Sequence, residues 1–290
     1  MFEASVGGGI PIISSIIEIL QANNINRIDG ILNGTTNYIL TRLSRSKLNF
    51  NEVLKEAQEK GFAEANPSAD IDGFDILRKI VILSSIAFKC TIPEGDVHLR
   101  GIRNITKQDI DMADSFGYSI KYIAQGLNNN NKYSLSVTPV FLKKDSIISN
   151  VNEEYNIVLV DGDIVGKQCF IGKGAGQNAT AHAVINDLVK VINKTSQYRN
   201  LRFDEDLTSS GVEGIENEYY LRVTCPDFRT LSKAFIFIDR YINKNKFVFS
   251  ENNLYLLTER MKSTDMKNLY ESLQNISDDV FYARLEHNLL

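Results

Sequence analysis

The sequence predicts an α+β protein in two parts. The first part is a domain of largely antiparallel sheet with helices, and the second is a small ferredoxin-like βαββαβ domain. Apolar residues recur at helical spacing up to Phe116, and from Tyr118 they alternate with polar residues, as in half-buried strands. A β-α-β-β-α-β order follows a polar, aperiodic stretch, and a length of 290 residues suits about two domains.

Composition excludes several classes of protein. With 32 basic and 36 acidic residues the formal net charge is −4, so no basic surface for nucleic acid is expected. No apolar run reaches the roughly 20 residues that a membrane span needs. Cys90, Cys169 and Cys225 are too widely spaced for a disulfide framework or a metal motif, which favours a cytoplasmic protein with reduced thiols.

In the first part, helical periodicity predicts helices at residues 10–20, 37–44, 50–60, 73–89 and 107–116, with a short strand at 26–32. Residues 33–36 (NGTT) form the expected turn before the second helix, and Gly61 ends the third. We expect residues 61–72 to be a polar loop, from which Asp70 or Asp72 caps the next helix.

In the second half, alternation predicts strands at 118–124, 133–140, 157–160 and 164–170, with the asparagine run 128–131 at a hairpin tip. Residues 172–176 (GKGAG) end this sheet, and a helix is expected at 180–192. After a polar stretch at 194–213, the last part reads as strands at 219–224, 246–250, 253–258 and 279–285, with helices at 230–241 and 264–276.

Asp75 and Lys79 are the strongest chemical feature. They lie four residues apart at the start of an apolar helix, so they share a helix face. One interpretation is an exposed ion pair worth about 0.3–0.5 kcal/mol. The other is a lysine that an aspartate orients, so that its ammonium can give a proton to a developing alkoxide. Glu64, in the acid-rich loop before this helix, could recognise a substrate ammonium.

Two glycine loops are weaker features. In residues 3–10 (EASVGGGI), carbonyl groups and the Glu3 carboxylate could suit a hard cation such as Na⁺, although a tight structural turn is the favoured interpretation. The GKGAG loop precedes a helix whose first amides could meet an anion, but position 177 is Gln, so it is not the dinucleotide fingerprint. The three histidines, at 98, 182 and 287, are too scattered for a catalytic arrangement.

Four strings of the sequence together resemble the homoserine dehydrogenase family. They are residues 3–13 (EASVGGGIPII), 30–40 (GILNGTTNYIL), 61–79 (GFAEANPSADIDGFDILRK) and 172–184 (GKGAGQNATAHAV). The similarity runs from Glu3 to about Ile192, and the third string is very specific. It implies an oxidoreductase that reduces aspartate 4-semialdehyde to homoserine with NAD(P)H, in threonine and methionine biosynthesis.

The resemblance also implies roles for individual residues. Lys79 would be the proton donor to the carbonyl oxygen and Asp75 its partner, and Glu64 would bind the substrate amino group. By the same resemblance, Asp70 and Thr35 would line the pocket and Gly176 would lie close to the nicotinamide cofactor. Glu3, with the backbone of Val6, Gly8 and Ile10, would hold a structural sodium ion. The helix that begins near Thr180 would pack onto the cofactor domain.

The C-terminal part resembles an ACT domain, a small regulatory module that many members of this family carry. The expected division is a catalytic and dimerisation region at 1–196, a linker at 197–213 and an ACT-like domain at 214–290. The module usually has a Pro-Gly pair in its first loop, whereas this chain has Pro226 and Asp227 there. The resemblance implies a homodimer or higher homo-oligomer and a possible threonine effector.

One family feature has no match in this sequence. The family begins with a Rossmann domain whose glycine fingerprint holds the cofactor pyrophosphate. Without it we expect the isolated chain not to turn over substrate. The alternative hypothesis is a non-catalytic amino-acid-sensing or dimerisation module that derives from the enzyme, although a sensor has no need of a proton donor such as Lys79.

Overall fold

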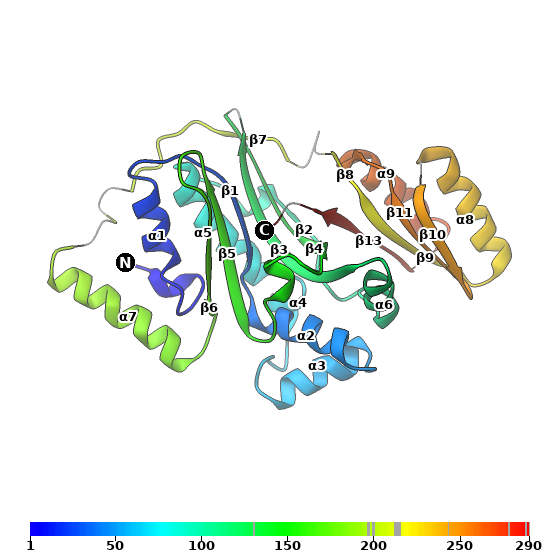
Figure 1. Cartoon of the computed structure of the whole chain (residues 1–290), viewed down its shortest axis with the longest axis horizontal. Coiled ribbons are helices and arrows are strands. Elements are labelled where there is room, and N and C mark those ends of the chain that lie inside the picture. The colour runs from blue at the N-terminus through cyan, green and yellow to red at the C-terminus, as the bar shows by residue number, and fades with distance from the viewer. Residues whose placement is uncertain are drawn as a thin grey trace. The chain divides into compact units, whose positions relative to one another are not determined.

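The computed structural model describes residues 1–129, 131–195, 198, 201–211, 216–242, 244–277, 279–287 and 289. They form two compact units (Figure 1). The first contains Met1–Ile102, Tyr122–Thr138 and Asn150–Gly211, and the second contains Arg103–Lys121, Pro139–Ser149 and Val212–Leu290. Two internal segments therefore belong to the unit that holds the C-terminal residues. The division into a catalytic region, a linker and an ACT-like domain stays a prediction.

The sheet of the first unit is built on β1 (Ile25–Ile31). This strand pairs antiparallel with β3 (Tyr118–Asn129) and β5 (Tyr155–Gly162), and β5 pairs antiparallel with β6 (Gly166–Lys173). On the far side of β3 lies β4 (Lys132–Lys143), along which β2 (Val97–Leu99) and β7 (Thr208–Ser209) run parallel. The predicted, largely antiparallel sheet is confirmed, while β2 and β7 are too short to show a sequence period. Of the expected hairpin tip, Asn130 lies outside the described residues.

Helices of the first unit follow the predicted spacing. The structure has α1 (Ile12–Ile19), α2 (Gly34–Arg45), α3 (Phe50–Glu59), α4 (Ser68–Ile71), α5 (Phe74–Phe88) and α7 (Gln177–Ile192), and the short 3₁₀ turns η1 (Glu3–Ser5) and η2 (Glu94–Asp96). Helices α1 and α5 pack on each other and on the sheet, and most of their apolar residues are buried. No helix among the described residues is long and apolar enough to cross a membrane.

Two local predictions are wrong. Residues 34–36 are the first turn of α2 and not a separate turn, because the Asn33 side chain accepts a hydrogen bond from the amide of Thr36 and caps the helix. The expected loop contains α4, and neither Asp70 nor Asp72 caps α5, whose N-cap is Gly73 at φ +93°. Glycine is required there, since a Cβ would overlap the Tyr122 hydroxyl.

The second unit has the predicted β-α-β-β-α-β order. Its elements are β9 (Tyr219–Thr224), α8 (Phe228–Tyr241), β10 (Lys244–Ser250), β11 (Asn253–Thr258), α9 (Ser263–Gln274) and β13 (Asp279–Glu286), with α6 (Lys107–Ser115) and the 3₁₀ turn η3 (Ile148–Asn150) from earlier in the chain. The strand order is β10-β11-β9-β13, with antiparallel neighbours, and β13 also runs parallel to residues 140–142 of β4. A two-residue pair, β8 (Glu216–Asn217) with β12 (Met261–Lys262), completes it.

One face of this four-stranded sheet carries both helices. Leu221 and Val223 of β9 pack in the same buried cluster as Leu231 of α8 and Leu269 of α9. Asp227, at the loop position where the ACT module usually has glycine, caps α8 by accepting a hydrogen bond from the Thr230 amide at 2.7 Å. This loop therefore closes a helix end with its side chain.

A buried ion cluster lies elsewhere in the same unit. Arg222 of β9 donates through Nε to Asp109 of α6 at 2.9 Å and through Nη1 to Asp279 of β13 at 2.5 Å. The Tyr220 hydroxyl also donates to Asp109, at 2.7 Å. Burial raises the pKa of Asp109, and the Arg222 guanidinium opposes that rise. The cluster ties three elements of the unit together.

Candidate functional site

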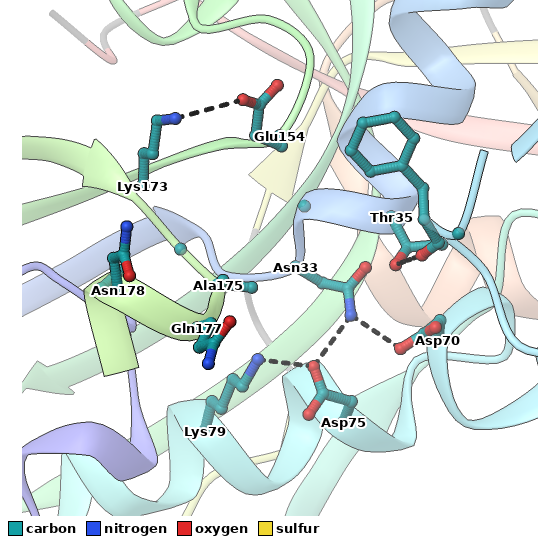
Figure 2. Close-up of a pocket in the computed structure, with 16 residues that line it drawn as sticks. Asn33, Thr35, Asp70, Asp75, Lys79, Glu154, Lys173, Ala175, Gln177 and Asn178 are labelled. Atoms are coloured by element: carbon teal, nitrogen blue, oxygen red, sulfur yellow. Dashed lines mark hydrogen bonds and ion pairs between the residues drawn. The ribbon is translucent and has the colours of Figure 1, made fainter. Parts of the chain in front are cut away.

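The first unit contains a cavity of about 650 Å³. Its walls come from the start of α2, the helices α4 and α5, and the loop between β6 and α7, so segments far apart in the sequence meet here (Figure 2). Lys79, Asp75, Asp70, Thr35 and Gly176, all expected site residues, line it. The structure thus brings together in one cavity five of the side chains and backbone positions that the sequence singles out.

The Lys79 ammonium is held at a fixed point of the cavity wall. It donates to Asp75 Oδ2 at 2.7 Å and to the Leu32 carbonyl at 2.9 Å. Its side chain is 19% exposed and that of Asp75 is 33% exposed, so this is not a solvated surface pair. An ammonium has three N–H donors. Two are used by these described residues, which leaves one for a ligand in the cavity.

Asn33 links the acidic groups, and sequence reasoning missed its role. Its Nδ2 donates to Asp70 Oδ1 at 2.8 Å and to Asp75 Oδ2 at 2.9 Å (Figure 2). Residue 33 is easily taken for a turn residue in NGTT, because nothing in local spacing connects it to acids 37 and 42 positions away. A buried amide next to a catalytic lysine candidate is a signal that only the fold supplies.

Asp70 and Thr35 form the other side of this group. Partial burial raises the pKa of Asp70, and the hydrogen bond from Asn33 opposes that rise. Thr35 Oγ1 donates to the Phe62 carbonyl at 2.6 Å, which fixes the loop after α3 against the start of α2. Glu64, by contrast, is exposed and does not line the cavity, and its main-chain carbonyl accepts a hydrogen bond from Gln58 at 3.0 Å. Its expected role in binding an amino group stays a prediction.

The GKGAG loop forms the opposite wall. Gly176 has φ +112°, a conformation that side chains rarely adopt, and it directly precedes α7. Lys173 Nζ lies 3.9 Å from Glu154 Oε1 at this wall (Figure 2). The N-terminal glycine loop packs against it so closely that a Cβ on Gly8 would overlap the Gly174 carbonyl oxygen. The close approach of the two backbones therefore accounts for glycine in both loops.

The Glu3 carboxylate, an expected sodium ligand, already has several protein partners. It is buried and accepts hydrogen bonds from the amides of Ile13 (2.8 Å) and Ser14 (3.1 Å), so it caps α1, and Lys190 Nζ lies 3.6 Å away. The carbonyl of Ile10 already accepts from the Ile12 amide at 2.7 Å. No group of three or more His, Cys, Asp or Glu that could hold a metal occurs among the described residues. The sodium site expected at Glu3, Val6, Gly8 and Ile10 stays a prediction.

Comparison with known proteins gives one consistent family. The homoserine dehydrogenase family profile matches residues 11–189. A homoserine dehydrogenase of Pseudomonas aeruginosa is 36% identical over 98% of this chain and 70% of its own length. One of Synechocystis sp. is 42% identical over 78% of this chain and 55% of its own length. The chain thus spans between about half and 70% of these relatives.

Solved structures agree with the sequences. The crystal structure of a homoserine dehydrogenase from Thiobacillus denitrificans matches 99% of this chain and 70% of that chain, with a TM-score of 0.88 and 34% identity. A hyperthermophilic archaeal homoserine dehydrogenase mutant in complex with NADPH matches 68% of this chain and 57% of that chain, with a TM-score of 0.58 and 30% identity. The predicted resemblance is confirmed: the chain belongs to the homoserine dehydrogenase family of oxidoreductases.

Proposed function

We propose that this chain carries the substrate-binding and proton-transfer part of a homoserine dehydrogenase, which reduces aspartate 4-semialdehyde to homoserine with NAD(P)H in threonine and methionine biosynthesis. The single observation that supports it best is the Lys79 ammonium, held between the Asp75 carboxylate and the Leu32 carbonyl with one donor left for the cavity. Its geometry suits an oxygen acceptor on a ligand.

The residues around Gly176 fit the nicotinamide side of the cofactor. The positive φ at Gly176 brings backbone to the cavity without a side chain, and the first residues of α7 border the same space. When bound, NAD(P)H supplies a hydride to the aldehyde carbon. The chain's own part is on the oxygen: the Lys79 ammonium hydrogen-bonds the carbonyl oxygen, stabilises its growing negative charge and gives it a proton.

Charge orients the substrate in this scheme. Asp70 and Asp75 carry two negative charges against the single positive charge of Lys79, so this side of the cavity attracts the substrate ammonium. Asp70 is the nearer candidate for that contact, with Glu64 able to approach only from its exposed loop. Asp75 orients the Lys79 ammonium, and Thr35 holds the loop that closes this side.

We also propose what covers α7. Its exposed residues include Ile185 (57%), Leu188 (57%) and Ile192 (76%), an apolar face that suits burial against protein. In the proposed enzyme the cofactor-binding part covers it, as the resemblance implies. A homodimer or higher oligomer, a cytoplasmic location and a sodium ion held by Glu3 and the backbone of Val6, Gly8 and Ile10 belong to the same proposal.

Calorimetric titration of homoserine into the chain tests this proposal. We expect one binding site per chain. Two matched ligands separate the contacts: 2-aminobutyrate lacks the hydroxyl that Lys79 would meet, and 4-hydroxybutyrate lacks the ammonium that Asp70 would meet. Both should bind at least about tenfold more weakly, the typical cost of leaving a charged partner unpaired. Equal affinity for all three, or no homoserine binding with or without NADPH, contradicts the proposal.

Turnover is a separate question. We expect no oxidation of NADPH with aspartate 4-semialdehyde by this chain alone, measured as the loss of nicotinamide absorbance. Robust turnover would contradict the expectation that the cofactor is held mainly by residues outside this chain.

A second candidate function, amino-acid sensing, has its own observation. The C-terminal unit has a cavity of about 480 Å³ whose walls include Arg260, Asp265 and the apolar Leu269. A cation and a carboxylate over an apolar floor suit a zwitterion such as threonine. Threonine titration with Arg260→Met as the control variant tests this: binding that the substitution abolishes supports a sensor site, and no threonine binding rejects it.

A further inference from the structure

Asn33 makes three side-chain hydrogen bonds in the cavity wall. Its Oδ1 accepts from the Thr36 amide at 2.9 Å, and its Nδ2 donates to Asp70 and Asp75 at 2.8 and 2.9 Å. The side chain is buried, so these bonds are not shared with bulk water. The cap of α2 fixes which end of the amide faces the acids, because only the oxygen can accept from Thr36.

The bridge matters because two carboxylates converge on one point. Burial raises the pKa of Asp70, and the nearby Asp75 charge adds to that rise. A lysine or arginine in place of Asn33 would relieve this repulsion but would also cancel the negative charge. An amide donor relieves it while the group of Asp70, Asp75 and Lys79 keeps a net charge of about −1 for a ligand cation.

Leu32, the residue before Asn33, contributes to the same hydrogen-bonded group. The Leu32 carbonyl accepts a hydrogen bond from the Lys79 ammonium. The two residues that follow β1 therefore supply an acceptor for the cation and, through the Asn33 amide, a donor for the carboxylates. Asp75 Oδ2 is the shared atom, since it accepts from both Lys79 and Asn33. Any displacement of the Asn33 amide therefore changes how Asp75 holds Lys79.

We propose that Asn33 is a positioning residue that holds the Asp70 and Asp75 carboxyl groups side by side, so that Asp75 aims Lys79 and Asp70 takes the ligand ammonium. The inference deepens the proposed function and rests on it for the identity of the ligand. The groups that face Asp70 are Asn33 and Thr35 of the α2 start and Asp75 and Lys79 of α5, with Glu154 and Lys173 on the opposite wall of the cavity.

Two substitutions separate the bridge from the helix cap. Asn33→Ser keeps a good N-cap acceptor for Thr36 but removes the amide donor. Asn33→Asp also keeps the acceptor and the shape, but it places a third carboxylate against the first two. A role in capping alone predicts that Asn33→Ser, which adds no charge, behaves like the parent chain in everything except small changes of stability.

The measurement is the titration of the Asp70 carboxyl by carbon-13 NMR, assigned with Asp70→Asn. We expect the pKa of Asp70 to rise in Asn33→Ser and to rise further in Asn33→Asp. Homoserine affinity at neutral pH should fall by at least about tenfold in Asn33→Asp. It should partly recover at about pH 5, where the introduced carboxyl group can be protonated and then donate a hydrogen bond as the amide does.

An Asp70 pKa that is the same in Asn33→Ser as in the parent chain overturns the inference. If the parent chain binds no homoserine, the proposed function fails, while the Asp70 titration still decides the role of Asn33. Should Asn33→Asp fail to fold, Asn33→Ser carries the pKa comparison alone, because it adds no charge.

Discussion

Each unit contains a cluster of aspartates around a cation. The two clusters differ in burial and in how many hydrogen bonds of the cation are made to protein groups. In the C-terminal unit, Asp109 is 0% and Arg222 2% exposed, and the guanidinium is used by Asp109, Asp279 and the Asn104 carbonyl. In the first unit, Lys79 is 19% and Asp75 33% exposed, and one wall of the cluster is a cavity.

The difference shows how a structural cluster can be told from a functional one. A buried ion pair is maintained only when protein groups satisfy its hydrogen-bonding groups, and Arg222 donates four hydrogen bonds to described residues. The Lys79 ammonium is also held by two hydrogen bonds, but its third N–H donor remains for a ligand in a cavity that can contain a substrate. A hydrogen-bond donor that the protein leaves for a ligand, more than charge itself, therefore distinguishes the functional cluster.

The largest expected effect is on stability in the C-terminal unit. Arg222→Met leaves Asp109 buried without a cation, and breaking such a pair costs about 3–5 kcal/mol. Urea unfolding measures it. The affinity of the folded chain for homoserine should not change. A loss below about 1 kcal/mol would mean that the cluster is not the structural tie described above.

The next effect is on binding. Lys79→Met should weaken homoserine binding by about tenfold or more, since a charge-assisted hydrogen bond is lost, while the free energy of unfolding changes by no more than about 1 kcal/mol. Calorimetry and urea unfolding on the same preparation check both. A stability loss as large as that of Arg222→Met would remove the distinction between the clusters.

A smaller effect of opposite sign is expected at Asp70. Because the folded-state pKa of Asp70 is raised, ionisation of Asp70 lowers the free energy of unfolding as the pH rises from the unfolded-state pKa through the folded-state pKa. Asp70→Asn should therefore stabilise the chain at neutral pH by about 1 kcal/mol or less, and the gain should vanish below about pH 4, where the unfolded chain is protonated too. Urea unfolding across this pH range measures it. A gain that persists at low pH would point to packing instead of charge.

The smallest effect serves as the reference for an exposed ion pair. Arg45, 54% exposed, lies 2.7 Å from Glu153. Arg45→Met should change the free energy of unfolding by no more than about 1 kcal/mol, and less in high salt. A loss comparable to that of Arg222→Met would show that burial does not separate the two kinds of pair.

Much of the fold follows from local patterns. The bounds of β9 and β11 and the start of α3 agree with prediction, because alternation, capping and glycine signals act within a few residues. Helix α4 escapes prediction, since its four residues are too few to show a period. The start of α2 lies earlier than predicted because Asn33 caps the helix through its side chain.

The site divides in the same way. Asp75 and Lys79 can be paired from the sequence because they are four apart on one helix. Asn33 cannot, since its partners come from other elements. The Glu3 carboxylate, expected to bind a cation, turns back to cap α1 and meets Lys190, which lies 187 positions later and so gives no local signal.

The central claim, that Lys79 in this cavity acts on the oxygen of the substrate, has one direct test. The affinities of the parent chain and of Lys79→Met for homoserine and for 2-aminobutyrate form a two-by-two comparison. We predict that the substitution weakens homoserine binding by about tenfold or more and leaves 2-aminobutyrate binding almost unchanged. Equal losses for both ligands would show that Lys79 does not contact the hydroxyl, and would contradict the claim.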